Sequence, residues 1–551
     1  MAASGPHMQE WPLVTSAMLR HAALNHASAT VVSVDVDGSP PSVSTVRQLY
    51  DRCVLLALAL DRLGLQRGDV LATLALNRRR TAEAYHALMA HGLVCHTLNP
   101  RLFLEQLVYI AGHAGDKWLL VDADLLPLAA RLVERVPCIA GLIVLADAVP
   151  AHDRLRVPVL CYETLLAAEA LPADPLAFPW HGTDERADAS LCFTSGTTGN
   201  PKGVVYTHRS LTLHAMAVVT PDCMCLSSKE VALMIVPAFH ANGWSILSAA
   251  LISGCTLVLP GAHLDGRSVH NLILSQKVTL TAGVPTVFMG LLAHLADTPG
   301  ATLGTLRRVI VGGAAVPPSM LRTFEEKYGV TVQHAYGLTE TSPMLTLNTP
   351  KGALPRSLAQ ALKQGRAPFT VELRLVDDAG AELPWDGFAT GNLQARGPAV
   401  LRRYLALPPA LVGGWFDTGD VACIDSEGFV QICDRKKDLI KSGGEWLSSV
   451  DVEGATMSLP GLAQAACIGV PDAKWGERPA ILAVAKAGAR VSAADVVAHL
   501  RGSLAKWQLP EERHVFFVDA LLLTATGKFD KKAMREWLQP GGKLHRQDAK
   551  L

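Results

Sequence analysis

The stretch TSGTTGNPKG, residues 194–203, indicates both the fold and the chemistry of this chain. It places three glycines, four hydroxyl side chains and one lysine in a single loop. Glycine lets backbone N–H groups approach an anion closely, the hydroxyls add neutral donors, and Lys202 adds a positive charge. The apolar runs 189–193 and 204–206 predict a pair of strands around the loop. We therefore expect a phosphate-binding hairpin. It differs from the common P-loop, because Lys202 is followed by Gly203 and not by Ser or Thr. A turn without a ligand is the alternative.

Composition limits the class of protein. The chain has 551 residues, so two or more domains are expected. Lys and Arg number 50, as do Asp and Glu, and this balance argues against a nucleic-acid-binding protein. Apolar residues make up 49% of the chain, but Gly, Ser, Pro or charged residues interrupt every apolar run before it is long enough to span a membrane. The eleven cysteines lack metal-ligand spacing and are interpreted as reduced thiols.

The pattern along the chain predicts an α/β protein. From residue 43 to about 390, amphipathic helices such as 47–63 and 81–91 alternate with short strands, which is typical of a helix-covered, mostly parallel sheet. The expected strands are 70–75, 118–121, 141–145, 231–236, 256–259, 278–283 and 308–312, with a core helix and a strand in 246–260. After residue 371 the texture becomes that of a turn-rich β subdomain, with turns at 377–380 and 425–428. A charged run, 434–438, then leads to a small α+β segment. We therefore expect a domain boundary in this run, between an N-terminal domain, 1–435, and a C-terminal domain, 436–551.

Three further motifs carry chemistry. YGLTET, residues 336–341, combines a ring that can stack on a base, a hydroxyl that can bind a phosphate, and a carboxylate, Glu340, that can hold Mg²⁺. Its alternative is a helix N-terminus capped by Thr339. WFDTGD, 415–420, offers an Asp that can accept both hydrogen bonds of a ribose diol, or it is only a turn. TATGK, 524–528, presents Lys528 on a flexible loop and, taken alone, is typical of a surface turn.

Together these motifs resemble the adenylate-forming superfamily of acyl-CoA synthetases, luciferases and peptide-synthetase adenylation domains. The resemblance extends from about residue 45 to 532, and it includes DRKKDLIKSGGEW, residues 434–446. HTLNPRL, VPAFHANGW and SGGEW are most similar to the medium- to long-chain fatty acid CoA ligases. The resemblance implies two steps: a carboxylate attacks the α-phosphorus of Mg·ATP, and CoA then displaces AMP from the acyl-adenylate. ATP, Mg²⁺, CoA and a carboxylic acid are the implied cofactors and partners.

The resemblance also implies roles for individual residues at the nucleotide. The β- and γ-phosphates would be held by Thr194, Ser195, Gly196, Thr197, Thr198 and Lys202, and Mg²⁺ by Thr194 and Glu340. Thr339 would contact the α-phosphate, and Asp420 and Arg435 the ribose. The adenine and its surroundings would be lined by Gly313, Ala314, Ala315, His334, Ala335, Tyr336 and Gly337. His334 stands where many relatives have Gln, which puts its adenine contacts in doubt. Asn392 stands where Glu is frequent.

The resemblance places the ATP and acyl sites in the N-terminal domain, 1–435. It implies a second set of residues in a mobile C-terminal domain, 436–551. Lys528 would bridge the acyl carboxylate and the α-phosphate in the first step. Lys437 would be the hinge, and Lys441 would belong to the face that replaces Lys528 in the second step. Ser442, Gly443 and Gly444 would flank the pantetheine channel, with Trp446 also at the CoA site.

The acid itself is less well indicated. Trp244 corresponds to an aromatic gate of long-chain relatives, or it is a core tryptophan; His240, Ala241 and Val284 would lie near the acyl chain. Aryl or methylthio-alkanoate CoA ligases are alternatives within the same fold, as are a luciferase-like oxidase and a carrier-protein-loading enzyme. The last normally has an Asp after Phe239, where this chain has His240. A non-enzymatic binding module is disfavoured because Lys202, Glu340 and Lys528 are all present.

The ends of the chain bear on location. The N-terminus lacks the organisation of a secretion signal, so we expect a cytoplasmic protein. The final Ala549-Lys550-Leu551 is similar to a peroxisomal address, which is the alternative for a eukaryotic source. The chain could also form a homodimer.

Overall fold

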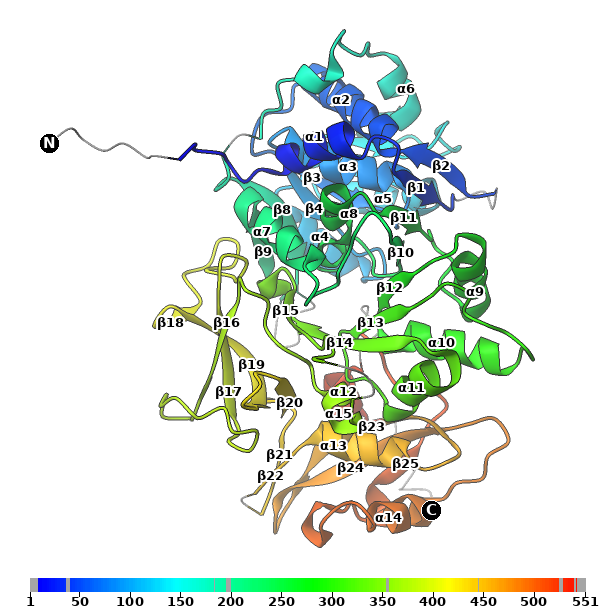
Figure 1. Ribbon diagram of the computed structural model, residues 1–551, viewed down its shortest axis with the longest axis vertical. Coiled ribbons are helices and arrows are strands. Elements are labelled where there is room, and N and C mark those ends of the chain that lie inside the picture. Colours follow the sequence, from blue (N-terminus) through cyan, green and yellow to red (C-terminus); the bar gives the residue numbers. More distant parts are fainter. Residues whose placement is uncertain are drawn as a thin grey trace, which may run out of the picture.

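The described residues form four sheets, and Figure 1 labels their strands in chain order. The computed structural model describes residues 8–35, 40–182, 184–194, 200–352, 356–443, 445–524, 529–539 and 542. The sheets contain seven, eight, five and five strands. The predicted α/β class, with a β-rich subdomain and an α+β C-terminal unit, is confirmed.

The seven-stranded sheet has the order β7-β6-β5-β3-β4-β8-β9 and is parallel except for the β8–β9 hairpin. Its strands are β3 (Val70–Leu74), β4 (Val94–Thr97), β5 (Trp118–Val121), β6 (Gly141–Val144), β7 (Val159–Cys161), β8 (Asp188–Phe193) and β9 (Gly203–Thr207). The accompanying helices are α2 (Val46–Arg62), α3 (Arg79–Ala90), α4 (Leu104–Ala114), α5 (Leu126–Val133) and α6 (Tyr162–Ala167). Helix α2 begins with a reciprocal cap: Gln48 N–H donates to Thr45 Oγ1 at 3.1 Å, and Thr45 N–H donates to Gln48 Oε1 at 2.8 Å.

The eight-stranded sheet has the order β15-β14-β13-β12-β10-β11-β1-β2 and is antiparallel only at its two edges. Its strands are β1 (Thr30–Ser33), β2 (Ser42–Thr45), β10 (Val231–Met234), β11 (Thr256–Leu259), β12 (Leu280–Gly283), β13 (Arg308–Gly312), β14 (Thr331–Gly337) and β15 (Met344–Leu347). Its helices are α1 (Thr15–Asn25), α7 (His208–Val219), α8 (Ile246–Ser253), α9 (Gly266–Ser275), α10 (Pro285–Ala296), α11 (Pro318–Arg322) and α12 (Leu358–Leu362).

The two large sheets share one core on their facing sides. Alternate residues of a strand face opposite sides of its sheet, so the other side of each sheet packs separately. Leu71 of β3 and Ala232 of β10 belong to one apolar cluster, together with side chains of α1, α2, α3, α7 and α8. Their neighbours Ala72 and Leu233 pack instead against α4 and α5 or against α9 and α10. Both faces of each sheet are therefore covered, which explains the near-continuous apolar runs of the strands.

The remaining two sheets follow in the chain. The third is antiparallel and contains β16 (Glu372–Val376), β17 (Gly391–Arg396), β18 (Leu411–Val412), β19 (Trp415–Ile424) and β20 (Val430–Arg435). The fourth contains β21 (Ile440–Ser442), β22 (Glu445–Leu447), β23 (Leu462–Asp472), β24 (Gly476–Ala485) and β25 (Val515–Phe517), with helices α13 (Ser449–Met457), α14 (Ala493–Leu500) and α15 (Lys531–Leu538). The chain passes from the third sheet to the fourth between Arg435 and Ile440.

The expected elements mostly have the predicted ends. Strands 118–121, 256–259 and 308–312 are reproduced, and the segment 246–260 forms α8 followed by β11. In the C-terminal unit, α14 ends at Leu500, and residues 501–503 form a turn. Apolar side chains alone could not show this, because Leu504 still packs against the C-terminal core.

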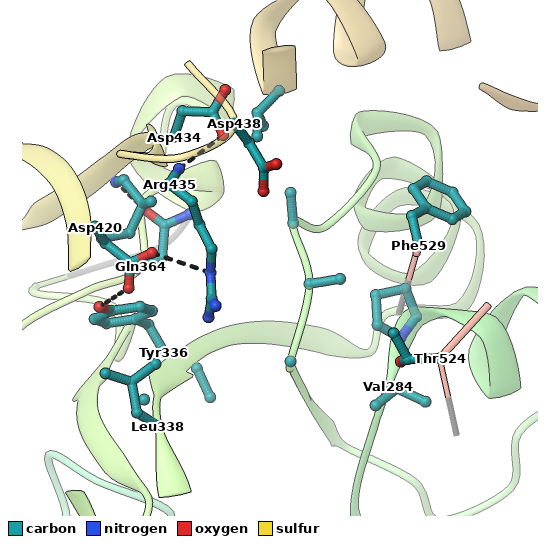
Figure 2. Close-up of a pocket in the computed structure, with 18 of the residues that line it drawn as sticks. Val284, Tyr336, Leu338, Gln364, Asp420, Asp434, Arg435, Asp438, Thr524 and Phe529 are labelled. Carbon is teal, nitrogen blue, oxygen red and sulfur yellow. Dashed lines mark hydrogen bonds and ion pairs between the residues drawn. The ribbon is translucent and has the colours of Figure 1, made fainter. Parts of the chain in front are cut away.

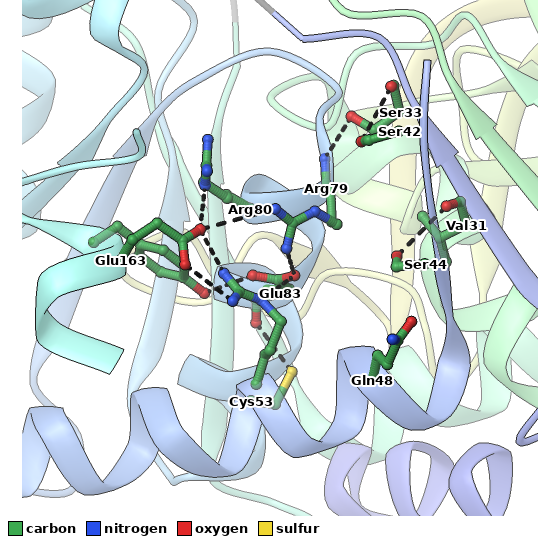
Figure 3. A network of polar contacts seen from close by, with 12 residues as sticks. Val31, Ser33, Ser42, Ser44, Gln48, Cys53, Arg79, Arg80, Glu83 and Glu163 are labelled. Atoms are coloured by element: carbon green, nitrogen blue, oxygen red, sulfur yellow. Dashed lines mark hydrogen bonds and ion pairs between the residues drawn. The ribbon is translucent and has the colours of Figure 1, made fainter. Parts of the chain in front are cut away.

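A buried ionic cluster ties three helices of the N-terminal region together (Figure 3). Glu83 of α3 has a fully buried side chain and accepts hydrogen bonds from Arg52 Nε at 2.8 Å, Arg79 Nη1 at 2.8 Å and Tyr162 Oη at 2.9 Å. Glu163 of α6 in turn accepts from Arg52 Nη2 and from Arg80 Nε, each at 2.7 Å. The cluster is a structural one, since α2, α3 and α6 each contribute a charged partner.

Within the residues described, no helix combines the length and apolar character needed to cross a bilayer.

Candidate active site

One cavity of about 1290 Å³ lies where the eight-stranded sheet, the β19–β20 hairpin and the C-terminal unit meet. Figure 2 shows Tyr336, Asp420 and Arg435 on one side of it and Val284, Thr524 and Phe529 on the other. The cavity therefore collects side chains from the carboxyl ends of parallel strands, which is the usual place for a ligand in such sheets.

The predicted pair of strands around residues 194–203 is present. Strands β8 and β9 pair antiparallel, with Cys192 opposite Val204. At its base, Thr194 N–H donates to Lys202 O at 2.9 Å, and Lys202 N–H donates to Thr194 Oγ1 at 3.3 Å. Both residues line the cavity. Ser195, Gly196, Thr197 and Thr198 lie outside the described residues.

Tyr404 joins two of the predicted charges. Lys202 Nζ lies 4.9 Å from the centroid of the Tyr404 ring, and Tyr404 Oη donates to Glu340 Oε1 at 2.8 Å. Burial, and the Glu340 carboxylate beside it, raise the pKa of Tyr404, so the phenol remains a donor. Sequence reasoning missed Tyr404, because a lone tyrosine in RRYLALP carries no signal of its own.

The two predicted ribose residues are neighbours. Asp420 and Arg435 are paired across β19 and β20, with Arg435 Nε 3.3 Å from Asp420 Oδ1. Tyr336 Oη donates a hydrogen bond to the other oxygen of Asp420. Burial and the adjacent Asp420 raise the pKa of Tyr336, which keeps this phenol protonated. Tyr336, Asp420 and Arg435 thus form one polar group on the cavity wall.

The residues predicted around adenine lie on two adjacent strand ends. Parallel pairing places Gly312 beside Ala335, and Gly313, Ala314 and Ala315 follow β13 into the cavity wall. His334 Nδ1 lies 2.9 Å from Leu362 O, and burial lowers the pKa of His334 to about 4. This histidine is therefore neutral near pH 7.

The segment after β14 explains why the last residue of that strand, Gly337, is a glycine. A Cβ at Gly337 would lie 1.7 Å from Pro343 O, so only glycine fits. Thr339 is the first residue of a three-residue 3₁₀ turn, Thr339–Thr341, and its carbonyl accepts a hydrogen bond from Tyr206 Oη at 2.6 Å. The alternative of a helix capped by Thr339 is wrong, because the turn is too short and Thr339 lies inside it.

The C-terminal unit contributes unequally. Thr524 and Phe529, which flank residues 525–528, line the cavity, while Lys528 itself lies outside the described residues. Lys437 also lines the cavity, and partial burial lowers the pKa of its amine. Its carbonyl accepts from Arg535 Nη2 at 3.4 Å.

The predicted CoA face lies elsewhere. Of the residues described, those lining the cavity do not include Lys441, Ser442, Gly443 or Trp446. Lys441 Nζ is 5.2 Å from the ring centroid of Trp446, and Ser442 Oγ accepts from Arg478 Nη1 at 3.0 Å. Gly443 has φ of +64°, and a Cβ there would lie 2.7 Å from the Trp475 ring. Gly444 lies outside the described residues.

The acyl-side residues all reach the cavity. His240, Ala241, Trp244 and Val284 line it, together with Met289. Trp244 is only 5% exposed and also belongs to the core between the two large sheets. The two interpretations of Trp244 are therefore compatible: it is a core residue that forms part of the cavity wall.

Comparisons with known proteins agree with this architecture. Residues 19–405 match the family model for AMP-binding enzymes, and residues 451–528 match that for the AMP-binding enzyme C-terminal domain. The chain is 44% identical to 3-methylmercaptopropionyl-CoA ligase of Ruegeria lacuscaerulensis, over 96% of this chain and 98% of that protein. It is 42% identical to medium-chain-fatty-acid–CoA ligase of Ectopseudomonas oleovorans, over 95% of this chain and 96% of that protein. It is also 42% identical to long-chain-fatty-acid–CoA ligase of Thermus thermophilus, over 90% of each chain.

Among solved structures, ATP-bound MatB from Rhodopseudomonas palustris superposes with a TM-score of 0.81 at 26% identity, over 96% of this chain and 99% of that one. The chain belongs to the AMP-binding enzyme family, and it is an AMP-forming acid–thiol ligase of the adenylate-forming superfamily.

Proposed function

We propose that this ligase activates a hydrophobic, monocarboxylic acid of the fatty acid type and that the cavity described above holds ATP and the acid together. One observation carries the proposal: Lys202, Glu340 and Asp420 share a single cavity with Trp244 and Val284. The same cavity thus offers charged groups suited to a nucleotide and apolar groups suited to an acyl chain. The relatives named above, which act on medium-chain, long-chain and methylmercapto acids by name, support the same class of substrate.

The residues fit a magnesium ion. Thr194 and Glu340 both line the cavity and offer hydroxyl and carboxylate oxygens, the ligands that Mg²⁺ prefers. Tyr404 fixes one oxygen of Glu340 and leaves the carboxylate's remaining lone pairs for other partners. When bound, Mg²⁺ would neutralise phosphate charge.

In the adenylation step the chain's own task is to align two anions. We infer that the β8–β9 loop and Lys202 hold the β- and γ-phosphates, and that Asp420 accepts hydrogen bonds from the ribose hydroxyls. Arg435 and Tyr336 orient Asp420 for this role. Lys528 would lie between carboxylate and α-phosphate, because the residues on either side of its loop, Thr524 and Phe529, line the cavity. Electrostatic stabilisation and proximity then supply most of the rate.

Thioester formation requires a second arrangement. Thr524 and Phe529, which flank residues 525–528, line the cavity, whereas Lys441, Ser442 and Gly443, on β21 and the turn after it, are not among its described lining residues. We infer that the C-terminal unit, from residue 436, rotates about Lys437 and brings the Lys441–Ser442–Gly443 face to the adenylate. Trp446 would then lie beside the incoming CoA.

The sources of the relatives bear on the compartment. Three relatives at 42–44% identity come from bacteria, so we place the reaction in the cytoplasm. The peroxisomal alternative receives no support from them.

The test is a screen for AMP release that depends on both ATP and CoA. The acids are straight-chain fatty acids from short to long, 3-methylmercaptopropionate, benzoate and malonate. We expect the highest kcat/KM with a medium- to long-chain fatty acid. A preference for 3-methylmercaptopropionate would select the methylthio-alkanoate alternative, which the 44% identity supports. A preference for benzoate would select the aryl alternative and contradict the fatty acid type, and a preference for malonate would contradict the monocarboxylic class. Light emission or oxygen consumption would point to a luciferase-like enzyme.

A further inference from the structure

A strained turn lies in the acyl wall of the cavity. Five consecutive residues, Ala241–Ser245, have positive φ angles of 40°, 44°, 63°, 55° and 58°. Four of the five are not glycine. Left-handed backbone costs about 1–2 kcal/mol for each such residue, so this conformation persists only if the surrounding structure holds it.

Asn242 is the residue that holds the turn from within. Its side chain is 2% exposed and makes three hydrogen bonds. Oδ1 accepts from Ser190 Oγ at 2.7 Å, and Nδ2 donates to Thr97 Oγ1 at 3.1 Å and to Cys192 Sγ at 3.2 Å. Burial raises the pKa of Cys192 to about 11, so the thiol stays protonated and uncharged beside the amide. Both polar atoms of the amide are therefore hydrogen-bonded to protein.

Two of the three partners of Asn242 belong to the strand that leads to Thr194. Ser190 and Cys192 lie on β8, and the last residue of β8, Phe193, and the residue after it, Thr194, line the cavity. On the other side of Asn242, Ala241 and Trp244 line the acyl region of the same cavity. Asn242 is not among the described lining residues. It connects the two walls without reaching the ligand space.

A second connection leaves the turn at its other end. Ser245 Oγ lies 2.7 Å from His214 Nδ1, and Met344 N–H donates to His214 Nε2 at 3.1 Å. Because Nε2 accepts, Nδ1 carries the proton and donates to Ser245. Burial lowers the pKa of His214 to about 4, which keeps the ring in this neutral form. Through Met344 the turn is also linked to the segment that carries Thr339 and Glu340.

We propose that Asn242 is a positioning residue for adenylation: it fixes the spacing between the acyl wall at Ala241 and Trp244 and the phosphate loop that begins at Thr194. The inference rests on the proposed placement of the acyl chain and phosphates on these two walls. Alignment of carboxylate and α-phosphorus is set by that spacing, and a displacement of about 1 Å can cost a factor of 10² in rate.

The experiment uses Asn242→Gly, because glycine accepts the left-handed backbone and lacks the amide side chain. We expect kcat for acid-dependent ATP–pyrophosphate exchange to fall about 10- to 100-fold. The KM for ATP and the KM for the acid should each change less than about threefold. Ser190→Ala, which leaves the turn's sequence intact, should reproduce part of the loss, and the double variant should lose less than the product of the two. Ser190→Ala also keeps the inference testable if Asn242→Gly does not fold.

Tyr162→Phe is the matched control, since it removes one buried hydrogen bond to Glu83 outside the cavity. Its kcat should stay within about twofold of wild type. A wild-type kcat in both Asn242→Gly and Ser190→Ala would overturn the inference. So would a loss of kcat in Tyr162→Phe as large as that in Asn242→Gly, if the two variants have the same melting temperature. If the wild-type enzyme itself adenylates no acid of the panel, the proposed substrate class fails; an active wild type with unaffected variants refutes only the role of Asn242.

Discussion

The cluster around Glu83 and the wall of the active-site cavity are made of the same residue types, yet they differ in what their charges face. Glu83 is fully buried, and its oxygens accept from Arg52, Arg79 and Tyr162. In the cavity, Arg435 keeps 40% of its side chain exposed, and Lys202 is exposed beside the Tyr404 ring. A charge enclosed by partners serves the fold, whereas a charge that keeps an open side is available to a ligand. Substitutions in the two regions should therefore separate stability from activity.

The largest effect is expected in the buried cluster. Glu83→Gln removes the negative partner of Arg52 and Arg79, and loss of one member of a buried pair costs about 3–5 kcal/mol of unfolding free energy. Urea denaturation measures this loss. The kcat of the folded variant should remain near that of wild type. Glu105→Gln is the control, because Glu105 pairs with Arg135 at the surface, with side chains 76% and 52% exposed; it should cost less than about 1 kcal/mol. Equal losses for the two variants would contradict the comparison.

The opposite pattern is expected at Lys528. Lys528→Ala should lower the rate of acid-dependent pyrophosphate exchange about 10²–10³-fold, because it would remove the charge that we propose stabilises the transition state. The melting temperature should not change. Thioester formation from supplied acyl-adenylate should largely survive, and Lys532→Ala, which alters an exposed lysine of α15, should leave both half-reactions intact. If both half-reactions fall equally, Lys528 does not have the assigned role.

The fold and the charged residues of the site could be predicted because each carries a local signal. Asp420 and Arg435 stand in motifs, and the register of β19 and β20 then makes them neighbours. Tyr404 and Asn242 could not be found in this way. Their roles depend on partners far away in sequence, Glu340 for Tyr404 and Ser190 for Asn242. Neither hydropathy nor spacing records such a pairing, and a left-handed turn at Ala241–Ser245 has only one glycine to announce it.

Substitutions at Lys437, the proposed hinge, test whether the exposed charges of the cavity serve adenylation alone or also thioester formation. Lys437→Pro should spare pyrophosphate exchange and slow thioester formation about 10- to 100-fold, because proline fixes φ where we propose that the backbone rotates. Lys437→Ala removes the same amine and keeps the backbone free, so it is the control and should affect thioester formation much less. Unimpaired overall turnover of Lys437→Pro would show that the rotation occurs elsewhere.

The smallest effect concerns His334, a buried group that nevertheless lines the cavity. Its pKa is about 4 in the folded protein because of burial, below the value of about 6.5 expected in the unfolded chain. Between these values the unfolded chain binds a proton that the folded protein does not. The stability contributed by the neutral ring is therefore fully present above pH 6.5 and is lost as the pH falls toward 4, by about 1.4 kcal/mol per pH unit. His334→Gln should remove this contribution, so its unfolding free energy should fall less than that of wild type between pH 6.5 and 5.5. Exposed His152→Gln should follow wild type. Parallel curves for His334→Gln and wild type would mean that burial does not lower the pKa of His334 in the folded enzyme.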